Sequence, residues 1–143
     1  RIAQAVGGLP GKRIAFLGLA FKADTDDVRS SPALQLAARL LSEGADLRAH
    51  DPAAGGNAQM VLPDLVVVAD AAEALRDADA AVIATEWPVY RDLDWAALRP
   101  TMRRPLIIDG RRLLPDAQLR AMGYAVERIG DGVAGELEPA LAR

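Results

Sequence analysis

The sequence predicts an α/β fold: a doubly wound, mainly parallel sheet of about six strands with flanking helices. Short runs of β-branched and aliphatic residues alternate with helical patterns along the chain. The segments between successive runs are long enough to hold a crossover helix, which parallel strands require. The first run, residues 13–18, is apolar and ends in a glycine, which is typical of a strand buried on both faces of a sheet.

A helix is expected after the long polar stretch that follows this first strand. Ser31 and Pro32 form its start signal, because a hydroxyl caps a helix and proline already has the φ angle of a first helical residue. Gly44 stands where a left-handed terminus would end the helix. Between these limits, apolar residues follow one another at helical spacing: Leu34, Ala37, Ala38 and Leu41.

The remaining elements continue the alternation. Further strands are predicted over residues 46–50, 64–68, 80–84, 105–108 and 124–129, and helices over residues 71–76, 94–99 and 116–122. Residues 53–59 are expected to form a loop or a short helix. This succession of strand, helix and strand indicates right-handed crossovers, so we expect a Rossmann-like sheet.

Composition excludes several classes of protein. The chain has 143 residues, 51% of them hydrophobic, which suits one globular domain. With 17 basic and 20 acidic residues the net charge is −3, so the basic surplus of nucleic-acid or acidic-membrane binders is missing. No apolar run approaches the roughly 18 residues of a membrane span, and no secretory signal opens the chain, so a cytoplasmic protein is expected.

The chain contains no cysteine and a single histidine, His50. Disulfides, thiolate metal sites and a thiol nucleophile from this chain are therefore excluded, and a Ser-His or histidine-metal site is disfavoured. The acidic run Asp24, Asp26 and Asp27 lies beside basic residues, so it is expected to balance their charge rather than to bind a metal.

The carboxyl ends of the strands are the expected ligand edge of such a sheet. After the first strand, a dinucleotide-binding turn would read G-x-G-x-x-G, but only Gly18 is present, and Ala20 and Ala23 carry side chains where a pyrophosphate would need bare backbone. Asp51, after the second strand, has two interpretations. Either its carboxylate binds the ribose of a ligand, or Asp51 and Pro52 together simply turn the chain.

Basic residues at this edge are candidates for binding an anion. Lys22 lies deep in the loop after the first strand, in a chain where most basic residues are arginine, and it either meets a ligand or is merely solvated. Arg29 precedes a helix N-terminus and either grips a phosphate or pairs with Asp26 or Asp27. Arg111 and Arg112 follow the fifth strand, where diverging side chains leave one of them facing the site or both on the surface.

A family resemblance rests on these residues. The segment Gly18-Leu-Ala-Phe-Lys-Ala-Asp-Thr-Asp-Asp-Val-Arg-Ser-Ser-Pro32 resembles the signature that opens the C-terminal domain of UDP-glucose/GDP-mannose dehydrogenases. The similarity continues over about residues 11–130 through Asp51-Pro52, Thr85-Glu86-Trp87, Leu93-Asp94 and Asp109-Gly110-Arg111. It looks closer to the UDP-glucose 6-dehydrogenase branch, although Arg112 departs from the asparagine common in bacterial members.

The resemblance implies a division of labour between two domains. Such enzymes bind NAD on an N-terminal domain, which also carries a catalytic cysteine, and oxidise UDP-glucose to UDP-glucuronate. Their C-terminal domain holds the nucleotide sugar. By position, Phe21 and Lys22 would contact the UDP-sugar, Arg111 would hold its phosphates, and Arg29 would reach NAD. No catalytic residue and no metal ligand is implied for this chain.

The expected organisation follows from the same resemblance. Residues 1–10 would be the end of an interdomain helix and a linker, residues 11–130 the UDP-binding domain, and residues 131–143 an irregular tail. The partners implied are UDP-glucose or a related nucleotide sugar, the N-terminal domain of the same protein, and further copies in a homo-oligomer, with no nucleic acid and no membrane. The alternative hypothesis is a Rossmann-like assembly module without ligand binding, in which Trp87 belongs to an interface.

Overall fold

The computed structural model describes residues 2–128 of the chain, so the tail predicted over residues 131–143 lies outside the described residues. No helix within the described range is long and apolar enough to cross a membrane. The elements follow in the order α1 (Ile2–Val6), β1 (Arg13–Leu17), α2 (Pro32–Ser42), β2 (Asp46–His50), α3 (Gly55–Val61), β3 (Val66–Val67), α4 (Ala71–Leu75), β4 (Ala80–Ile83), α5 (Pro88–Arg91), α6 (Trp95–Leu98), a 3-10 turn η1 (Arg99–Thr101), β5 (Leu106–Asp109), α7 (Asp116–Ala121) and β6 (Ala125–Arg128).

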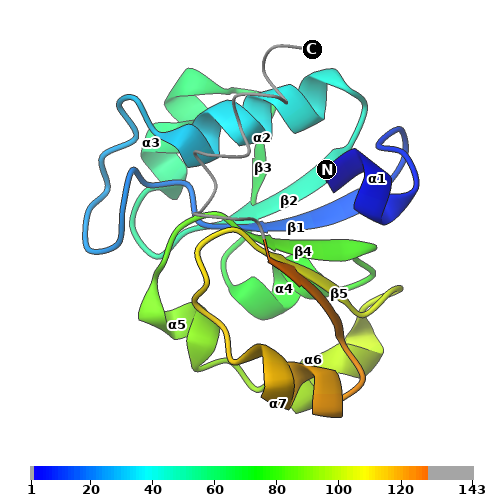
Figure 1. Ribbon diagram of the computed structural model, residues 1–143. Helices are drawn as coiled ribbons and strands as arrows, with labels where there is room; N and C mark the ends of the chain where they lie inside the picture. The colour runs from blue at the N-terminus through cyan, green and yellow to red at the C-terminus, as the bar shows by residue number, and fades with distance from the viewer. Residues whose placement is uncertain (1, 129–143) are drawn as a thin grey trace.

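The strands form one six-stranded sheet in the order β3-β2-β1-β4-β5-β6, and every neighbouring pair is parallel. This confirms the predicted doubly wound α/β class. Figure 1 shows α2 and α3 on one side of the sheet and α4 to α7 on the other. The strand order reverses between β1 and β4, which is where such folds gather ligands.

Helices on both faces explain why the strands are apolar without alternation. In β1, Ile14 and Phe16 belong to the core beneath α2, whereas Ala15 and Leu17 belong to the core on the side of α4. All four side chains are fully buried. A strand buried on both faces has no polar side, and this is why the continuous apolar run predicted the strand correctly.

Two elements differ from the sequence-based prediction, and one alternative left open by the sequence is decided. The strand expected over residues 64–68 is reduced to the two residues of β3, which pair with Arg48 and Ala49 of β2 at one edge of the sheet. Residues 55–61 form the helix α3, which settles the loop-or-helix alternative for this region. The helix α5 was not predicted; it is a single turn with Pro88 at its first position, too short for any periodic pattern.

Helix α2 begins as predicted. The Ser31 hydroxyl accepts a hydrogen bond from the backbone N–H of Leu34 at 3.2 Å, and Pro32 is the first helical residue. Gly44 has a φ angle of +92°, which allows the left-handed ending that the sequence indicated. The helix packs Leu36, Ala37 and Leu40 into the core on its side of the sheet.

Gly18 is a position where the fold requires glycine. Its φ angle is +106°, and a Cβ atom built there would lie 2.5 Å from the backbone nitrogen and the Cβ of Thr85. We expect Gly18→Ala to lower the free energy of unfolding by about 2–3 kcal/mol, because both the backbone angle and the close approach oppose a side chain. Urea unfolding followed by circular dichroism measures this loss.

Gly56→Ala is the matched control for this substitution. Gly56 lies in helix α3, and a Cβ atom there would meet nothing within 4 Å. The control is expected to leave stability unchanged or to raise it by up to about 1 kcal/mol, since alanine is the better helix former. Equal losses in the two variants would contradict the close packing of Gly18.

Candidate functional site

The switch point between β1 and β4 is closed by direct contacts. Beyond the close approach of Gly18 to Thr85, the Thr85 hydroxyl donates a hydrogen bond to the carbonyl of Ala20 at 3.0 Å. Thr85 itself is only 1% exposed. The chain directly after β1 therefore lies against the loop after β4, in the place where a dinucleotide pyrophosphate would lie in a G-x-G-x-x-G protein.

Asp51 holds this region together. The side chain is 8% exposed, and its two carboxylate oxygens accept hydrogen bonds from five N–H groups at 2.8–3.0 Å. The donors are the backbone N–H groups of Leu19, Ala20, Ala53 and Ala54 and the indole Nε1 of Trp87. Asp51 turns its own loop, as one interpretation predicted, through Ala53 and Ala54, and it also ties this loop to the loops after β1 and β4. The ribose interpretation stays a prediction.

Trp87 lies between the two sides of the fold. Its ring is partly buried and packs against both core clusters, and its indole nitrogen donates to Asp51 at 3.0 Å. Trp87 therefore contributes packing and a hydrogen bond to the inside of the carboxyl edge.

The loop between β1 and α2, at the left of Figure 1, is fixed at its base. The Ser31 hydroxyl, buried at 2% exposure, donates to the carbonyl of Leu19 at 2.8 Å. The backbone N–H of Phe21 donates to the carbonyl of Asp27 at 2.8 Å, which closes the loop into a narrow neck. These two hydrogen bonds fix the backbone at the base of the loop, and with it the positions of the side chains that the loop carries.

Phe21 and Lys22 lie on the surface at this neck. Phe21 is 49% exposed, although it is one of only two phenylalanines in the chain, and the other is fully buried in β1. Lys22 is exposed, and its ammonium group forms no ion pair with any residue in the range 2–128. An apolar ring beside an unpaired cation offers two complementary contacts to a nucleotide.

Arg29 adopts the second of its two predicted alternatives. Its Nε and Nη2 atoms lie 3.0 and 2.9 Å from the two carboxylate oxygens of Asp27, a bidentate pair, while 89% of the side chain stays exposed. The hydrogen bonds from Arg29 lower the pKa of Asp27 to about 2 and raise the pKa of the guanidinium. The structure shows Arg29 bracing its own loop.

The Asp27 pair can be tested by titration. Because the pKa of Asp27 is lowered in the folded chain, its contribution to stability is present above the pKa of the unfolded chain and is lost as the pH falls toward about 2. Arg29→Gln is expected to raise the Asp27 pKa toward about 3.9, the ordinary value for aspartate. Carboxyl carbon NMR shifts measured against pH follow this group directly.

Lys22→Gln serves as the control, because it removes the same charge from the same loop without touching Asp27. It should leave the Asp27 pKa unchanged. An Asp27 carboxyl that titrates alike in the wild type and in Arg29→Gln would contradict the bidentate pair.

Arg111 is positioned by Glu86 from the neighbouring loop. Its Nη2 atom lies 2.9 Å from Glu86 Oε1, and its side chain is 28% exposed. The fully buried Asp109 fixes the Arg111 backbone, since one oxygen accepts from the N–H of Arg111 at 3.0 Å and the other from Leu114 at 2.8 Å. The sequence indicated Arg111 but not the roles of these two carboxylates. The Asp109 contact, two residues away, has the spacing of an Asx turn that could have revealed it, whereas the Glu86 contact joins two separate loops and leaves no local signal.

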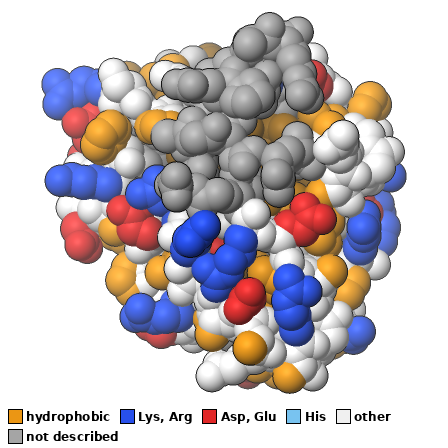
Figure 2. Space-filling model, in the orientation of Figure 1, with side chains coloured by type: hydrophobic (Ala, Val, Ile, Leu, Met, Phe, Trp, Pro, Cys, Tyr) orange, Lys and Arg blue, Asp and Glu red, His pale blue; other side chains and the backbone are white. Residues whose placement is uncertain are grey.

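The candidate side chains share one edge of the molecule. β1, β4 and β5 are consecutive in the sheet, so the loops carrying Lys22, Glu86 and Arg111 follow neighbouring parallel strands at the same end. On the face drawn in Figure 2, acidic and basic side chains are interspersed. The attraction of an anion to this edge therefore depends on nearby cations, such as Lys22 and Arg111, and not on the net charge of −3.

His50 has a structural role at the end of β2. The Tyr90 hydroxyl donates to the His50 carbonyl at 2.9 Å, and His50 Nδ1 lies 3.0 Å from the same hydroxyl. The hydroxyl proton is committed to the carbonyl, so Nδ1 must be the protonated ring nitrogen. Desolvation by burial lowers the pKa of His50, which keeps the ring neutral.

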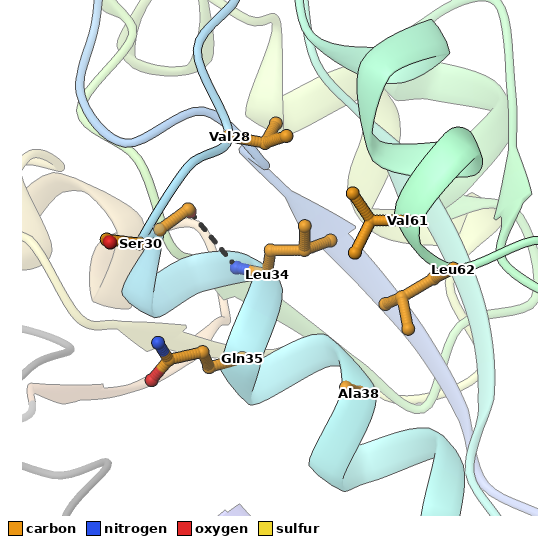
Figure 3. Close-up of a pocket in the computed structure, with 8 residues that line it drawn as sticks. Val28, Ser30, Leu34, Gln35, Ala38, Val61 and Leu62 are labelled. Carbon is orange, nitrogen blue, oxygen red and sulfur yellow. Dashed lines mark hydrogen bonds between the residues drawn. The ribbon is translucent and has the colours of Figure 1, made fainter.

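A groove between α2 and the end of α3 is apolar in character. It has a volume of about 220 Å³, and Figure 3 shows Leu34, Val61 and Leu62 pointing into it from the two helices. Val61 is 58% exposed. The groove presents no cationic side chain among its lining residues, so it does not suit a diphosphate.

Comparisons with known proteins agree with this geometry. UDP-glucose 6-dehydrogenase TuaD of Bacillus subtilis is 36% identical over 140 residues, covering 97% of this chain and 30% of that protein. UDP-glucose 6-dehydrogenase AglM of Haloferax volcanii is 46% identical over 106 residues, covering 74% of this chain and 24% of that protein. The solved structure of a UDP-glucose dehydrogenase from Pyrobaculum islandicum has a TM-score of 0.72 and 35% identity, covering 91% of this chain and 27% of that one.

The chain thus spans about 30% of the length of the curated relatives it matches. Residues 15–116 match the model described as the UDP binding domain of the UDP-glucose/GDP-mannose dehydrogenase family. This segment contains the loop after β1, Asp51, Glu86 and Arg111, which are the features that build the carboxyl edge. The chain therefore belongs to the UDP-glucose/GDP-mannose dehydrogenase family.

Proposed function

We propose that this chain binds the UDP part of a nucleotide sugar at the carboxyl edge of its sheet. The whole protein would be an NAD-dependent UDP-glucose 6-dehydrogenase that oxidises UDP-glucose to UDP-glucuronate. The observation that carries the proposal is the guanidinium of Arg111, held by Glu86 on the loop next to the switch point. The family match over residues 15–116 supports it.

The proposed contacts follow from the chemistry of the ligand. A diphosphate carries charge on several oxygens, and a planar guanidinium binds two of them through parallel N–H groups. We assign this role to Arg111, whose half-buried position reduces the freedom it loses on binding. Lys22 would add a compact second cation, and the exposed ring of Phe21 would pack on the nucleoside.

NAD does not fit as a principal ligand of this chain. The glycine fingerprint is missing, and the switch point is closed between Gly18, Ala20 and Thr85. Arg29 would be the one contact toward NAD, and reaching it would require exchanging Asp27 for a phosphate. We assign NAD binding and the catalytic cysteine to the part of the protein outside this chain, consistent with relatives about three times as long.

The proposed domain boundaries are those expected from the sequence. Residues 1–10 would end an interdomain helix and linker, and the described helix α1 places Ile2 and Val6 against the core of the domain. Residues 11–130 would form the UDP-binding domain. The N-terminal catalytic domain and further copies of the protein would be its partners, in the cytoplasm.

Calorimetry with UDP and with NAD tests the proposal on this chain. UDP is expected to bind more tightly than NAD, with an affinity limited by the missing half of the pocket. Lys22→Ala should weaken UDP binding, whereas Lys12→Ala, a control at the opposite end of β1, should not. Binding of NAD in preference to UDP, or no binding of UDP at all, would overturn it and favour the assembly module.

A further inference from the structure

A second group of charged side chains lies away from the carboxyl edge. A hollow of about 180 Å³ is lined by Arg13, Arg48, Val68, Glu73 and Arg76, so four of its five lining residues carry a charge. Three of those charges are guanidinium groups, supplied by β1, by β2 and by the residue after α4. None of these residues belongs to the proposed nucleotide site.

The pleat of the sheet explains why arginines gather here. Arg48 is the register partner of Ala15, and Arg13 stands two residues before Ala15, so all three side chains project from the same face. Ala15 is buried in the core that includes Ala74 and Leu75 of α4. Because α4 has only five residues, it leaves the side chains of Arg13 and Arg48 about 30% exposed beside it.

The positive charge of the hollow is incompletely neutralised. One oxygen of Asp46 lies 3.4 Å from Nε of Arg13 and 3.6 Å from Nη2 of Arg48, so a single atom serves two guanidinium groups at long distance. Within residues 2–128, Arg76 and Glu73 form no ion pair with each other or with the other two arginines. Three cations therefore share two carboxylates around one concave surface.

We propose that this hollow binds a phosphate group, at a site separate from the nucleotide site. Guanidinium groups from separate elements suit a tetrahedral oxyanion, which offers an acceptor oxygen in each direction. Arg13 begins β1, and the rise along the strand puts it about 13 Å from Leu17 at the carboxyl end. A phosphate bound here is therefore not the diphosphate held by Arg111, and this inference does not depend on the proposed nucleotide site.

Titration with inorganic phosphate at constant ionic strength tests the site, with the backbone amide signals of the labelled chain as the readout. The signals of Arg48, Val68 and Arg76 are expected to move together and to saturate. Arg76→Gln should weaken binding about fivefold, whereas Glu73→Gln should strengthen it about twofold, because they remove opposite charges from the same lining. Both residues are exposed, so neither substitution disturbs the core.

Arg91→Gln is the matched control, because it removes one exposed arginine from α5 and changes the net charge equally. It should leave phosphate binding unchanged. Glycerol phosphate then distinguishes the source: binding at least as tight as inorganic phosphate indicates an organic phosphate ester, and weaker binding indicates the free ion. The proposal is overturned by amide shifts that do not saturate, or by equal weakening in Arg91→Gln and Arg76→Gln.

Discussion

Replacing Arg111 with alanine is expected to weaken UDP binding by about 10- to 100-fold, or about 1.5–3 kcal/mol. The guanidinium is fixed by Glu86 at 2.9 Å and by a backbone anchored on Asp109, so its loss removes a prepared contact. Arg111→Lys should recover only part of the affinity, because an ammonium group keeps the charge and loses the planar fork. Calorimetry with UDP measures both variants.

Arg112→Asn is the control for this substitution. Arg112 is exposed and has a φ angle of +54°, which asparagine tolerates better than most residues. The control should lower UDP affinity by no more than about twofold, as expected for the loss of a nearby surface charge. Equal losses in Arg111→Ala and Arg112→Asn would mean that charge alone, and not the position of Arg111, attracts the ligand.

Glu86 provides an independent test of positioning. If it orients Arg111, Glu86→Gln weakens UDP binding in the wild-type background and has little further effect beside Arg111→Ala, a coupling that a double-mutant cycle measures. If the carboxylate instead competes with phosphate for the guanidinium, Glu86→Gln strengthens binding. The second result would contradict the positioning role of Glu86 while leaving UDP binding itself intact.

The largest loss of stability is expected for Asp51→Ala. This substitution leaves five N–H groups around a buried position without their acceptor and should lower the free energy of unfolding by about 3–5 kcal/mol. Asp51→Asn should lower it by less, because the amide keeps one acceptor oxygen while its NH2 group faces donors. Guanidinium chloride unfolding followed by circular dichroism and by tryptophan fluorescence measures both losses.

Asp70→Ala is the control for Asp51→Ala, because it removes an ordinary helix cap. Asp70 also accepts a backbone hydrogen bond, from Glu73 at 2.8 Å, but it is exposed at the start of α4. Its removal should cost about 1 kcal/mol, the usual value of a helix cap. A loss for Asp51→Ala no larger than that for Asp70→Ala would show that water replaces the carboxylate at the switch point.

The difference between the two aspartates shows where sequence reasoning reaches its limit. Asp70 caps a helix through a contact three residues away, which spacing along the chain reveals. Asp51 contacts Leu19 and Trp87, which are 32 and 36 residues distant. Asp51-Pro52 therefore has the pattern of a turn, and no local signal distinguishes it from one.

The sequence by itself determined the fold class, the helix α2 with its Ser31 cap, five of the six strands to within one residue, and the candidates Lys22 and Arg111. These follow from periodicity, capping and turn chemistry, which act between near neighbours along the chain. Only the tertiary structure decided that Glu86 holds Arg111 and that Thr85 closes the switch point. The reason is physical: packing the parallel strands brings together loops far apart in sequence, and one residue's side-chain partner then depends on the whole sheet.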